Sequence, residues 1–316
     1  MTKIFFFFFI IIIIIFLQSP PQIQSQTIPR NISIFILAGQ SNMAGRGGVY
    51  NDTATNTTVW DGVIPQECRS NPSILRLTAK LKWEIAKEPL HVDIDVNKTN
   101  GIGPGMSFAD RLFYRFGHVG LVPCSIGGTK LSQWQKGEFL YEETVRRAKA
   151  AVASSGGGSY RGILWYQGES DTVDMVDASV YKKRLVKYFT DLRSDLDQPN
   201  LPIIQAVAKI SYYQSSCGVA LATGAGPYLD AVRKAQLKTD LKNVYCVDAM
   251  GLPLEPDGLH LTTSSQVRLG QMIAQSFADN IPNSAQPLYM PLLITSFCCS
   301  LYIIFLEILA PTLPFL

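Results

Sequence analysis

The sequence is poor in histidine, with only three among its 316 residues, and it contains no block of lysine and arginine. Its formal net charge of +3 is close to neutral. A chain of this kind gives no indication of nucleic-acid binding or of attachment to an anionic membrane surface. The six cysteines lack the spacing of a zinc site, so we expect no metal centre.

The N-terminus has the layout of a secretory signal peptide. Lys3 supplies a positive start, residues 4–17 are an unbroken run of Phe, Ile and Leu, and residues 18–26 are polar. The apolar run is short for a membrane span, and a polar cleavage region follows it. We therefore predict a signal peptide over residues 1–25 and a secreted protein, with the cell wall as one destination. An uncleaved signal anchor is the alternative.

In a secreted protein, glycosylation sequons can be modified, and the chain has four of them, which begin at Asn31, Asn51, Asn56 and Asn97. Three of them fall in one hydrophilic stretch between Asn51 and Asn100. This clustering predicts an exposed, glycosylated insertion.

Four cysteines lie inside the central part of the chain: Cys68, Cys124, Cys217 and Cys246. In an oxidising compartment they could form two disulfides, with three possible connectivities. Cys124 and Cys246 lie in apolar runs typical of strands, so buried thiols are the alternative for these two.

The C-terminal residues 285–316 form a strongly apolar tail. Three interpretations stay open: a transmembrane helix, a signal for a lipid (GPI) anchor, and an extension that is not native to the protein. Membrane attachment is expected only through this tail. The remaining residues, 30–284, are expected to form one catalytic domain.

Short apolar runs alternate with helical patterns along this domain. Strands are predicted over residues 34–38, 119–126, 162–166, 202–208 and 244–248. Helices are predicted over residues 107–116, 139–154, 178–196, 227–239 and 263–280. The alternation predicts an α/β fold, a five-stranded parallel sheet with helices on both faces. Ligands bind such sheets at the carboxyl ends of the strands.

Ser41 directly follows the first predicted strand, within Gly39-Gln40-Ser41-Asn42-Met43. A serine hydroxyl becomes a nucleophile when a histidine takes its proton and a carboxylate orients that histidine. His260 and Asp257 lie three residues apart with a glycine between them, which lets both side chains turn the same way. The alternative is that Ser41 caps a helix and that Asp257 and His260 are ordinary surface residues.

Further polar residues follow other strands. Gly128, in Gly127-Gly128-Thr129, offers a backbone N–H. Gln167 offers a side-chain amide, with an amide that only braces its loop as the alternative. Together with the N–H of Ser41 they are candidates for an oxyanion site. Glu169 competes with Asp257 for the carboxylate role, or is a structural acceptor. Gln40 and Asn42 flank Ser41 and are candidates for supporting it.

Four segments together resemble the SGNH (GDSL-like) hydrolase superfamily: Gly39 to Met43, Gly127 to Thr129, Trp165 to Asp171 and Asp257 to Leu261. More narrowly, they are similar to the carbohydrate acetylesterases of family six and to sialate O-acetylesterases, especially plant members. The resemblance runs from about Ile32 to Asn280. It implies a flavodoxin-like, three-layer α/β/α fold and removal of acetyl groups from sugars.

The resemblance also implies roles for individual residues. Ser41 would be the nucleophile, His260 the general base and then acid, and Asp257 its orienting carboxylate. The oxyanion donors would be the N–H groups of Ser41 and Gly128 and the side chain of Gln167. The wider superfamily usually has asparagine at this third donor, whereas glutamine agrees with the narrower family.

We therefore expect an O-acetylesterase that acts on acetylated plant cell-wall or glycan carbohydrate and needs no cofactor. One alternative is a broad carboxylesterase or lipase of the same superfamily, which a long apolar acyl pocket would reveal. The other is a catalytically idle carbohydrate-binding protein or an acetyltransferase relative. The presence of Ser41, His260 and Asp257 argues against that last interpretation.

Overall fold

The computed structural model describes residues 29–207 and 226–281. The predicted signal peptide, Cys217 and the apolar C-terminal tail lie outside the described residues. The domain boundaries predicted at both ends therefore stay predictions.

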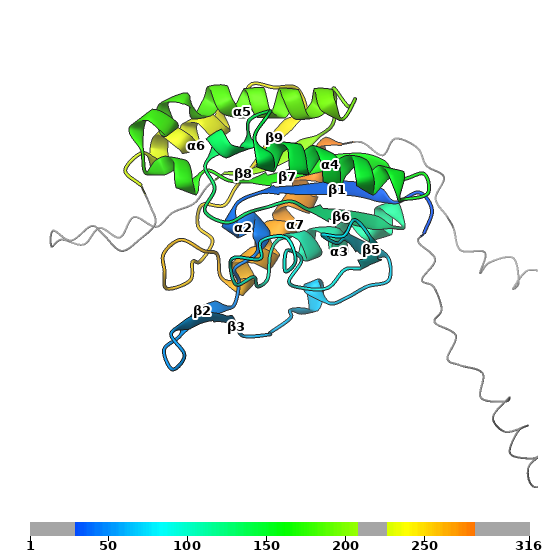
Figure 1. The fold of residues 1–316 in the computed structure, drawn as a ribbon, viewed down its shortest axis with the longest axis horizontal. Coiled ribbons are helices and arrows are strands. Elements are labelled where there is room, and N and C mark those ends of the chain that lie inside the picture. Colours follow the sequence, from blue (N-terminus) through cyan, green and yellow to red (C-terminus); the bar gives the residue numbers. More distant parts are fainter. Residues whose placement is uncertain (1–28, 208–225, 282–316) are drawn as a thin grey trace, which may run out of the picture. The chain divides into compact units, whose positions relative to one another are not determined.

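A seven-stranded sheet forms the centre of the described chain (Figure 1), in the order β5-β4-β6-β1-β7-β8-β9. Its strands are β1 (Ser33–Gly39), β4 (Ile74–Leu77), β5 (Trp83–Ile85), β6 (Val119–Pro123), β7 (Ser159–Tyr166), β8 (Ile203–Val207) and β9 (Val244–Asp248). β5 pairs antiparallel with β4, and every other neighbouring pair is parallel. The predicted α/β class is confirmed.

The predicted number of five strands is wrong, because β4 and β5 extend the sheet beyond β6. The five predicted strands do form the parallel core, β6-β1-β7-β8-β9, which is the flavodoxin order. β4 escaped prediction because Arg76 stands in the middle of its four residues. Arg76 is buried, and it pairs with Glu84 and Asp93. A single arginine in an otherwise apolar run of four residues therefore concealed a strand that belongs to the core.

Helices cover both faces of the sheet (Figure 1), which confirms the three-layer arrangement. α3 (Gly105–Phe116) and α7 (Thr263–Asn280) contact each other on one face. The other face carries α4 (Phe139–Ala153), α5 (Met175–Asp195) and α6 (Leu229–Leu237). These are the five predicted helices, with ends that differ by a few residues.

Buried aromatic rings hold the layers together. On one side of the sheet Phe35 of β1 packs edge-on against Phe108 of α3 and Phe277 of α7. On the other side Trp165 of β7 packs against Trp134 and Tyr188. Such pairs contribute roughly 0.5–1.5 kcal/mol each beyond the area that they bury. They fix the sheet whose strand ends carry the site.

Shorter elements connect the layers: α2 (Ser41–Ala44), the hairpin β2 (Val49–Asp52) and β3 (Thr57–Trp60), and the 3-10 turns η1 (Gln66–Cys68), η2 (Leu131–Trp134) and η3 (Glu169–Thr172). Asn51, Asn56 and Asn97 are exposed. The stretch from Asn51 to Asn100 is nevertheless not an insertion outside the core, because it contains β4. Glycosylation of these asparagines stays a prediction.

The described cysteines form no disulfide: Cys68, Cys124 and Cys246 are all free. Cys124 is a buried thiol, as one of the two interpretations held. For Cys246 the same interpretation is wrong, because this residue is exposed at the end strand β9.

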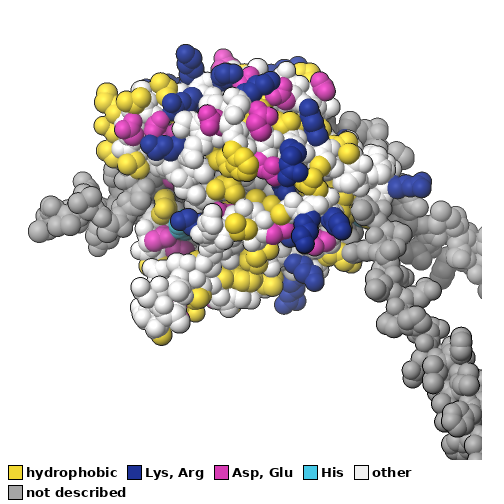
Figure 2. Space-filling view, viewed as in Figure 1, with side chains coloured by type: hydrophobic (Ala, Val, Ile, Leu, Met, Phe, Trp, Pro, Cys, Tyr) yellow, Lys and Arg dark blue, Asp and Glu magenta, His cyan; other side chains and the backbone are white. Residues whose placement is uncertain are grey.

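Positive and negative side chains are interspersed over the face of the molecule in Figure 2. This mixture agrees with the absence of a basic block in the sequence. Within residues 29–207 and 226–281, no helix combines the length and the apolar character needed to cross a membrane.

Candidate active site

Ser41 lies where the chain leaves β1 and enters α2. The turn requires glycine at position 39, because φ is +132° there and a Cβ atom would lie 2.1 Å from the carbonyl oxygen of Tyr166. Tyr166 ends the neighbouring strand β7. In the flavodoxin order the strand sequence reverses between these two strands, and ligands bind at such a switch point.

The structure brings Ser41, His260 and Asp257 together. His260 Nε2 lies 2.9 Å from Ser41 Oγ, and His260 Nδ1 lies 2.6 Å from Asp257 Oδ2. The histidine and the aspartate belong to the loop between β9 and α7. This hydrogen-bonded chain has the order that a serine nucleophile requires.

Asp257 stays ionised at the pH values at which proteins usually work. Burial acts to raise its pKa, but hydrogen bonds from the His260 ring and from the backbone N–H groups of His260 and Leu259 outweigh burial. Together they lower the pKa of Asp257 to about 2. A charged carboxylate at this position can stabilise an imidazolium ion on His260.

Asn42 forms hydrogen bonds to two loops, the one that holds His260 and the one that follows β7. Its Nδ2 donates to Glu169 Oε1 at 2.9 Å and to the carbonyl of Leu259 at 3.2 Å. Its Oδ1 accepts the backbone N–H of Leu261 at 3.0 Å. Asn42 is fully buried and therefore supports the site without reaching its surface.

Glu169 is close to the site but is not the partner of the histidine. It is 2% exposed, and its Oε2 has no hydrogen-bond partner within the described residues. Burial raises the pKa of Glu169, and the hydrogen bond from Asn42 lowers it only in part. Asp257, and not Glu169, binds the ring of His260.

The backbone N–H of Gly128 has no partner within the described chain, whereas that of Gly127 donates to Asp95 Oδ2 at 3.1 Å. Asp95 also pairs with the buried guanidinium of Arg46. Sequence reasoning missed Asp95 and Arg46. Arg46 stands five residues after Ser41, but nothing in the sequence links it to Asp95.

The structure does not bring Gln167 to the site, contrary to what the resemblance implied. The side chain is fully buried, and its Nε2 donates to the carbonyl of Thr129 at 2.9 Å and to Asp171 Oδ2 at 2.6 Å. Its Oε1 accepts from the hydroxyl of Tyr181 at 2.9 Å. An amide group has two hydrogens, so these bonds leave none for an oxyanion.

Gln40 faces the site instead. Its Oε1 accepts from the backbone N–H groups of Gly168 and Ser170 at 3.5 and 3.4 Å. These two backbone donors assign the oxygen to this end of the amide. The Nε2 end has no partner among the described residues.

These groups surround a cavity of about 280 Å³. It is lined by Gln40, Ser41, Arg46, Lys98, Gly127, Gly128, Glu169, Ser170, Val173, Leu259 and His260. Most of these residues are polar. No group of three or more His, Cys, Asp or Glu residues in the described chain is arranged to hold a metal ion. The cavity can present a nucleophile, a base and N–H donors to a small ester.

Residues 31–279 match the family described as carbohydrate esterase, sialic acid-specific acetylesterase. A probable carbohydrate esterase of Arabidopsis thaliana is 50% identical over 267 residues, which are 83% of this chain and 96% of that protein.

Solved structures agree with this relationship. The X-ray structure of an Arabidopsis thaliana protein superimposes with a TM-score of 0.73 at 49% identity, over 80% of this chain and 100% of that one. NanS has a TM-score of 0.60 at 14% identity, over 79% and 98% of the two chains, and this likeness shows the fold alone. The chain belongs to the carbohydrate esterase family of sialic acid-specific acetylesterases and is a hydrolase of ester bonds.

Proposed function

We propose that this protein removes O-acetyl groups from carbohydrates through Ser41, His260 and Asp257. The observation that carries the proposal is the hydrogen-bonded chain from Ser41 Oγ through His260 to Asp257 at a polar cavity. Membership of a carbohydrate esterase family supports the substrate class.

In the proposed reaction Ser41 Oγ attacks the acetyl carbonyl carbon while its proton passes to His260 Nε2. Asp257 accepts the hydrogen bond from Nδ1–H and stabilises the imidazolium. His260 then protonates the departing sugar oxygen, which leaves Ser41 acetylated. A water molecule, whose proton passes to His260, then attacks the carbonyl carbon of this ester. His260 returns the proton to Ser41 Oγ as the acyl–oxygen bond breaks, which releases acetate and restores the free serine.

The tetrahedral intermediates carry a negative oxygen that needs donors. We assign this role to the backbone N–H groups of Ser41 and Gly128, with Gln40 Nε2 as the side-chain donor in place of Gln167. Each such donor is typically worth about 3 kcal/mol of transition-state stabilisation.

The size and polarity of the cavity favour a small acyl group. Among the residues that line it, Val173 and Leu259 are the two with apolar side chains. This favours acetyl esters over the long-chain esters of a lipase.

The test is acetate release by the purified protein from acetylated xylan and from acetylated pectin, with p-nitrophenyl acetate as a small substrate. Wild type should release acetate from at least one polymer and cleave the small ester, and Ser41→Ala should do neither. Lack of turnover by wild type would refute the proposal, as would equal turnover by Ser41→Ala.

We also propose that the protein is secreted, on the basis of the apolar N-terminal run that follows Lys3. Polymeric acetylated carbohydrate of the cell wall would then be accessible to it. Fractionation of cells that express a C-terminally tagged chain tests this. Recovery of the tag from the cytosol, with residues 1–25 intact, would contradict it.

A further inference from the structure

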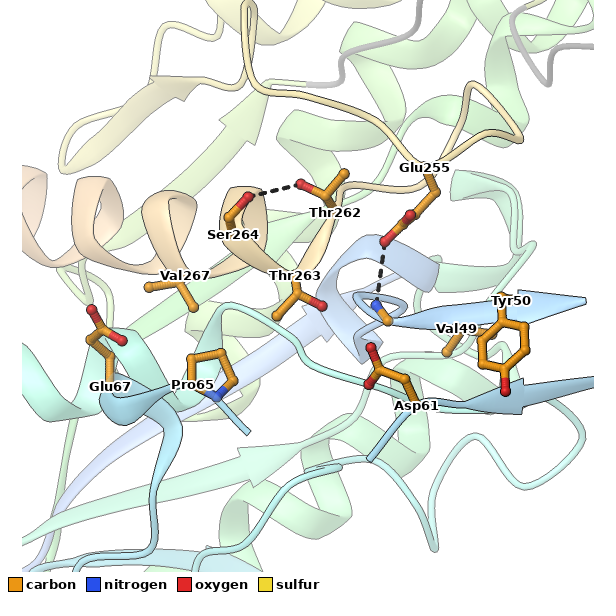
Figure 3. Close-up of a pocket in the computed structure, with 11 residues that line it drawn as sticks. Val49, Tyr50, Asp61, Pro65, Glu67, Glu255, Thr262, Thr263, Ser264 and Val267 are labelled. Carbon is orange, nitrogen blue, oxygen red and sulfur yellow. Dashed lines mark hydrogen bonds between the residues drawn. The ribbon is translucent and has the colours of Figure 1, made fainter. Parts of the chain in front are cut away.

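A second and larger cavity, of about 620 Å³, lies among the hairpin β2–β3, the turn η1 and the start of α7 (Figure 3). Its volume is within the range of about 300–1,000 Å³ that is usual for ligand sites. It is lined by Gly48, Val49, Tyr50, Asp61, Pro65, Glu67, Glu255, Thr262, Thr263, Ser264 and Val267. None of these residues belongs to the proposed catalytic machinery.

One loop contributes to the walls of both cavities. Glu255 and Thr262 line the second cavity, whereas Leu259 and His260 of the same loop line the catalytic one. The loop is closed on itself, because the N–H of Glu255 donates to the carbonyl of His260 at 2.7 Å. The two cavities therefore share this loop as a wall.

The polar groups of the second cavity suit a ligand rich in hydroxyl groups. Figure 3 shows Glu255, from the loop, and Asp61, which follows β3, between Thr263 on one side and Tyr50 on the other. Ionised carboxylates only accept hydrogen bonds, and sugar hydroxyls donate them. The carboxylate of Glu67 has no hydrogen-bond partner in the described part of the chain, so it is available to such a donor.

The apolar groups suit the faces of a sugar ring. Tyr50 is 54% exposed, and its hydroxyl has no partner among residues 29–207 and 226–281. An aromatic ring with a polar tip gives a large contact area at a wet surface. Val49, Pro65 and Val267 add apolar groups to other parts of the lining, and Figure 3 shows Pro65 and Val267 at the end away from Tyr50.

The charge of the cavity disfavours acidic ligands. Its lining contains three carboxylates and no lysine, arginine or histidine, so an acidic sugar would meet repulsion and no cationic partner. Its acidic residues are not a metal site, since the described residues contain no such cluster.

We propose that this cavity is a binding subsite for a neutral sugar residue of the same polysaccharide whose acetyl group enters the catalytic cavity. The subsite rests on the proposed function in that it needs a carbohydrate polymer as the substrate. The subsite further implies that the sugar residue bound beside the acetylated one carries no charge.

The test compares Tyr50→Ala and Glu67→Gln with wild type on acetylated xylo- and manno-oligosaccharides and on p-nitrophenyl acetate. We expect KM for the neutral oligosaccharide that wild type deacetylates to rise about five- to tenfold in each variant. We expect kcat to stay the same, and hydrolysis of p-nitrophenyl acetate, which is too small to reach the subsite, to be unchanged. Tyr114→Ala is the matched control, because Tyr114 is 84% exposed on α3 and lines neither cavity.

Binding of deacetylated oligosaccharides, followed by calorimetry, separates this proposal from the proposed function. Wild type should bind a neutral oligosaccharide more tightly than an oligogalacturonide, and both variants should bind it at least fivefold more weakly. Unchanged KM and unchanged binding in the variants overturn the subsite, whether or not the protein hydrolyses esters. Equal binding of the oligogalacturonide overturns its restriction to neutral sugars.

Discussion

The Asp95 carboxylate accepts the backbone N–H of Gly127 at 3.1 Å, and the same oxygen pairs with the guanidinium of Arg46. Both charged side chains are about 95% buried. The ion pair therefore holds Gly127 in place. Gly127 directly precedes Gly128, and we assign the N–H of Gly128 to the oxyanion site. The pair of Asp95 and Arg46 thus sets the position of this donor.

Asp95→Asn should weaken both stability and catalysis. Asparagine keeps an oxygen for Gly127 but leaves the charge of Arg46 without its buried partner, which costs about 3 kcal/mol. We expect a lower melting temperature and a kcat for p-nitrophenyl acetate that falls at least about tenfold.

Asp93→Asn is the control for this change. Asp93 lies in the same loop and pairs with Arg76, but it makes no hydrogen bond to Gly127 in the described structure. It should lose some stability and keep its kcat. Equal losses of kcat in the two variants would show that Asp95 acts only on folding.

Asp257→Asn and Glu169→Gln separate the two carboxylates that compete for the histidine. Asp257 binds His260 Nδ1, so its amide variant favours the wrong tautomer and should lose about 10⁴-fold in kcat. Glu169→Gln keeps an oxygen for Asn42 and should lose less than about tenfold. Steady-state kinetics on p-nitrophenyl acetate decide, and the reverse ranking would move the carboxylate role to Glu169.

The location of the site was predictable, whereas its full set of contacts was not. His260 lies three residues from Asp257, so local spacing was enough to predict that these two approach each other. The approach of Ser41, 219 residues away from His260, was expected because the carboxyl ends of parallel strands share one edge of the sheet and because of the family resemblance. Gln167 also follows a strand, but the direction of its amide depends on Thr129 and Tyr181, which are distant in the sequence, as well as on Asp171. Position along the chain does not reveal such competition for hydrogen bonds.

The same limit explains the errors in the fold. The strands β6, β1, β7, β8 and β9 were predicted from their apolar runs, and β1, β6 and β8 are buried along their whole length. β4 was missed since Arg76 interrupts its pattern and becomes acceptable in the core only after it pairs with Glu84 and Asp93. The sequence of a strand does not show which distant carboxylates will neutralise it.

The stability of the protein should depend on pH through Glu169. Burial raises the pKa of this residue, so the folded state holds its proton more tightly than the unfolded chain does. The resulting stability is fully present below the ordinary pKa of 4.5 and is lost as the pH rises through the raised pKa. Glu169→Gln does not titrate, so its melting temperature relative to wild type should increase between about pH 5 and pH 8. A constant difference over this range would mean that Glu169 is ionised equally in the two states.

The variants Gly127→Ala and Gly128→Ala test what holds the backbone N–H of Gly128 in position. A Cβ atom at position 127 would lie 2.6 Å from Arg46 Nη2 and 3.1 Å from Asp95 Oδ2, so the buried pair must move. At position 128 no atom lies within 4 Å of the added carbon, and the remaining cost is the strain of alanine at a φ of +76°. That strain is about 1–2 kcal/mol and leaves the N–H in place.

We therefore expect Gly127→Ala to lose at least about tenfold more kcat than Gly128→Ala when both are assayed on p-nitrophenyl acetate, although both should melt at lower temperature. The comparison isolates the ion pair, because each variant adds one methyl group to the same loop. If Gly128→Ala is the more damaged of the two in kcat, the position of its own N–H matters more than the support from Asp95. The loop would then be held mainly by its own backbone conformation and not by the charged pair behind it.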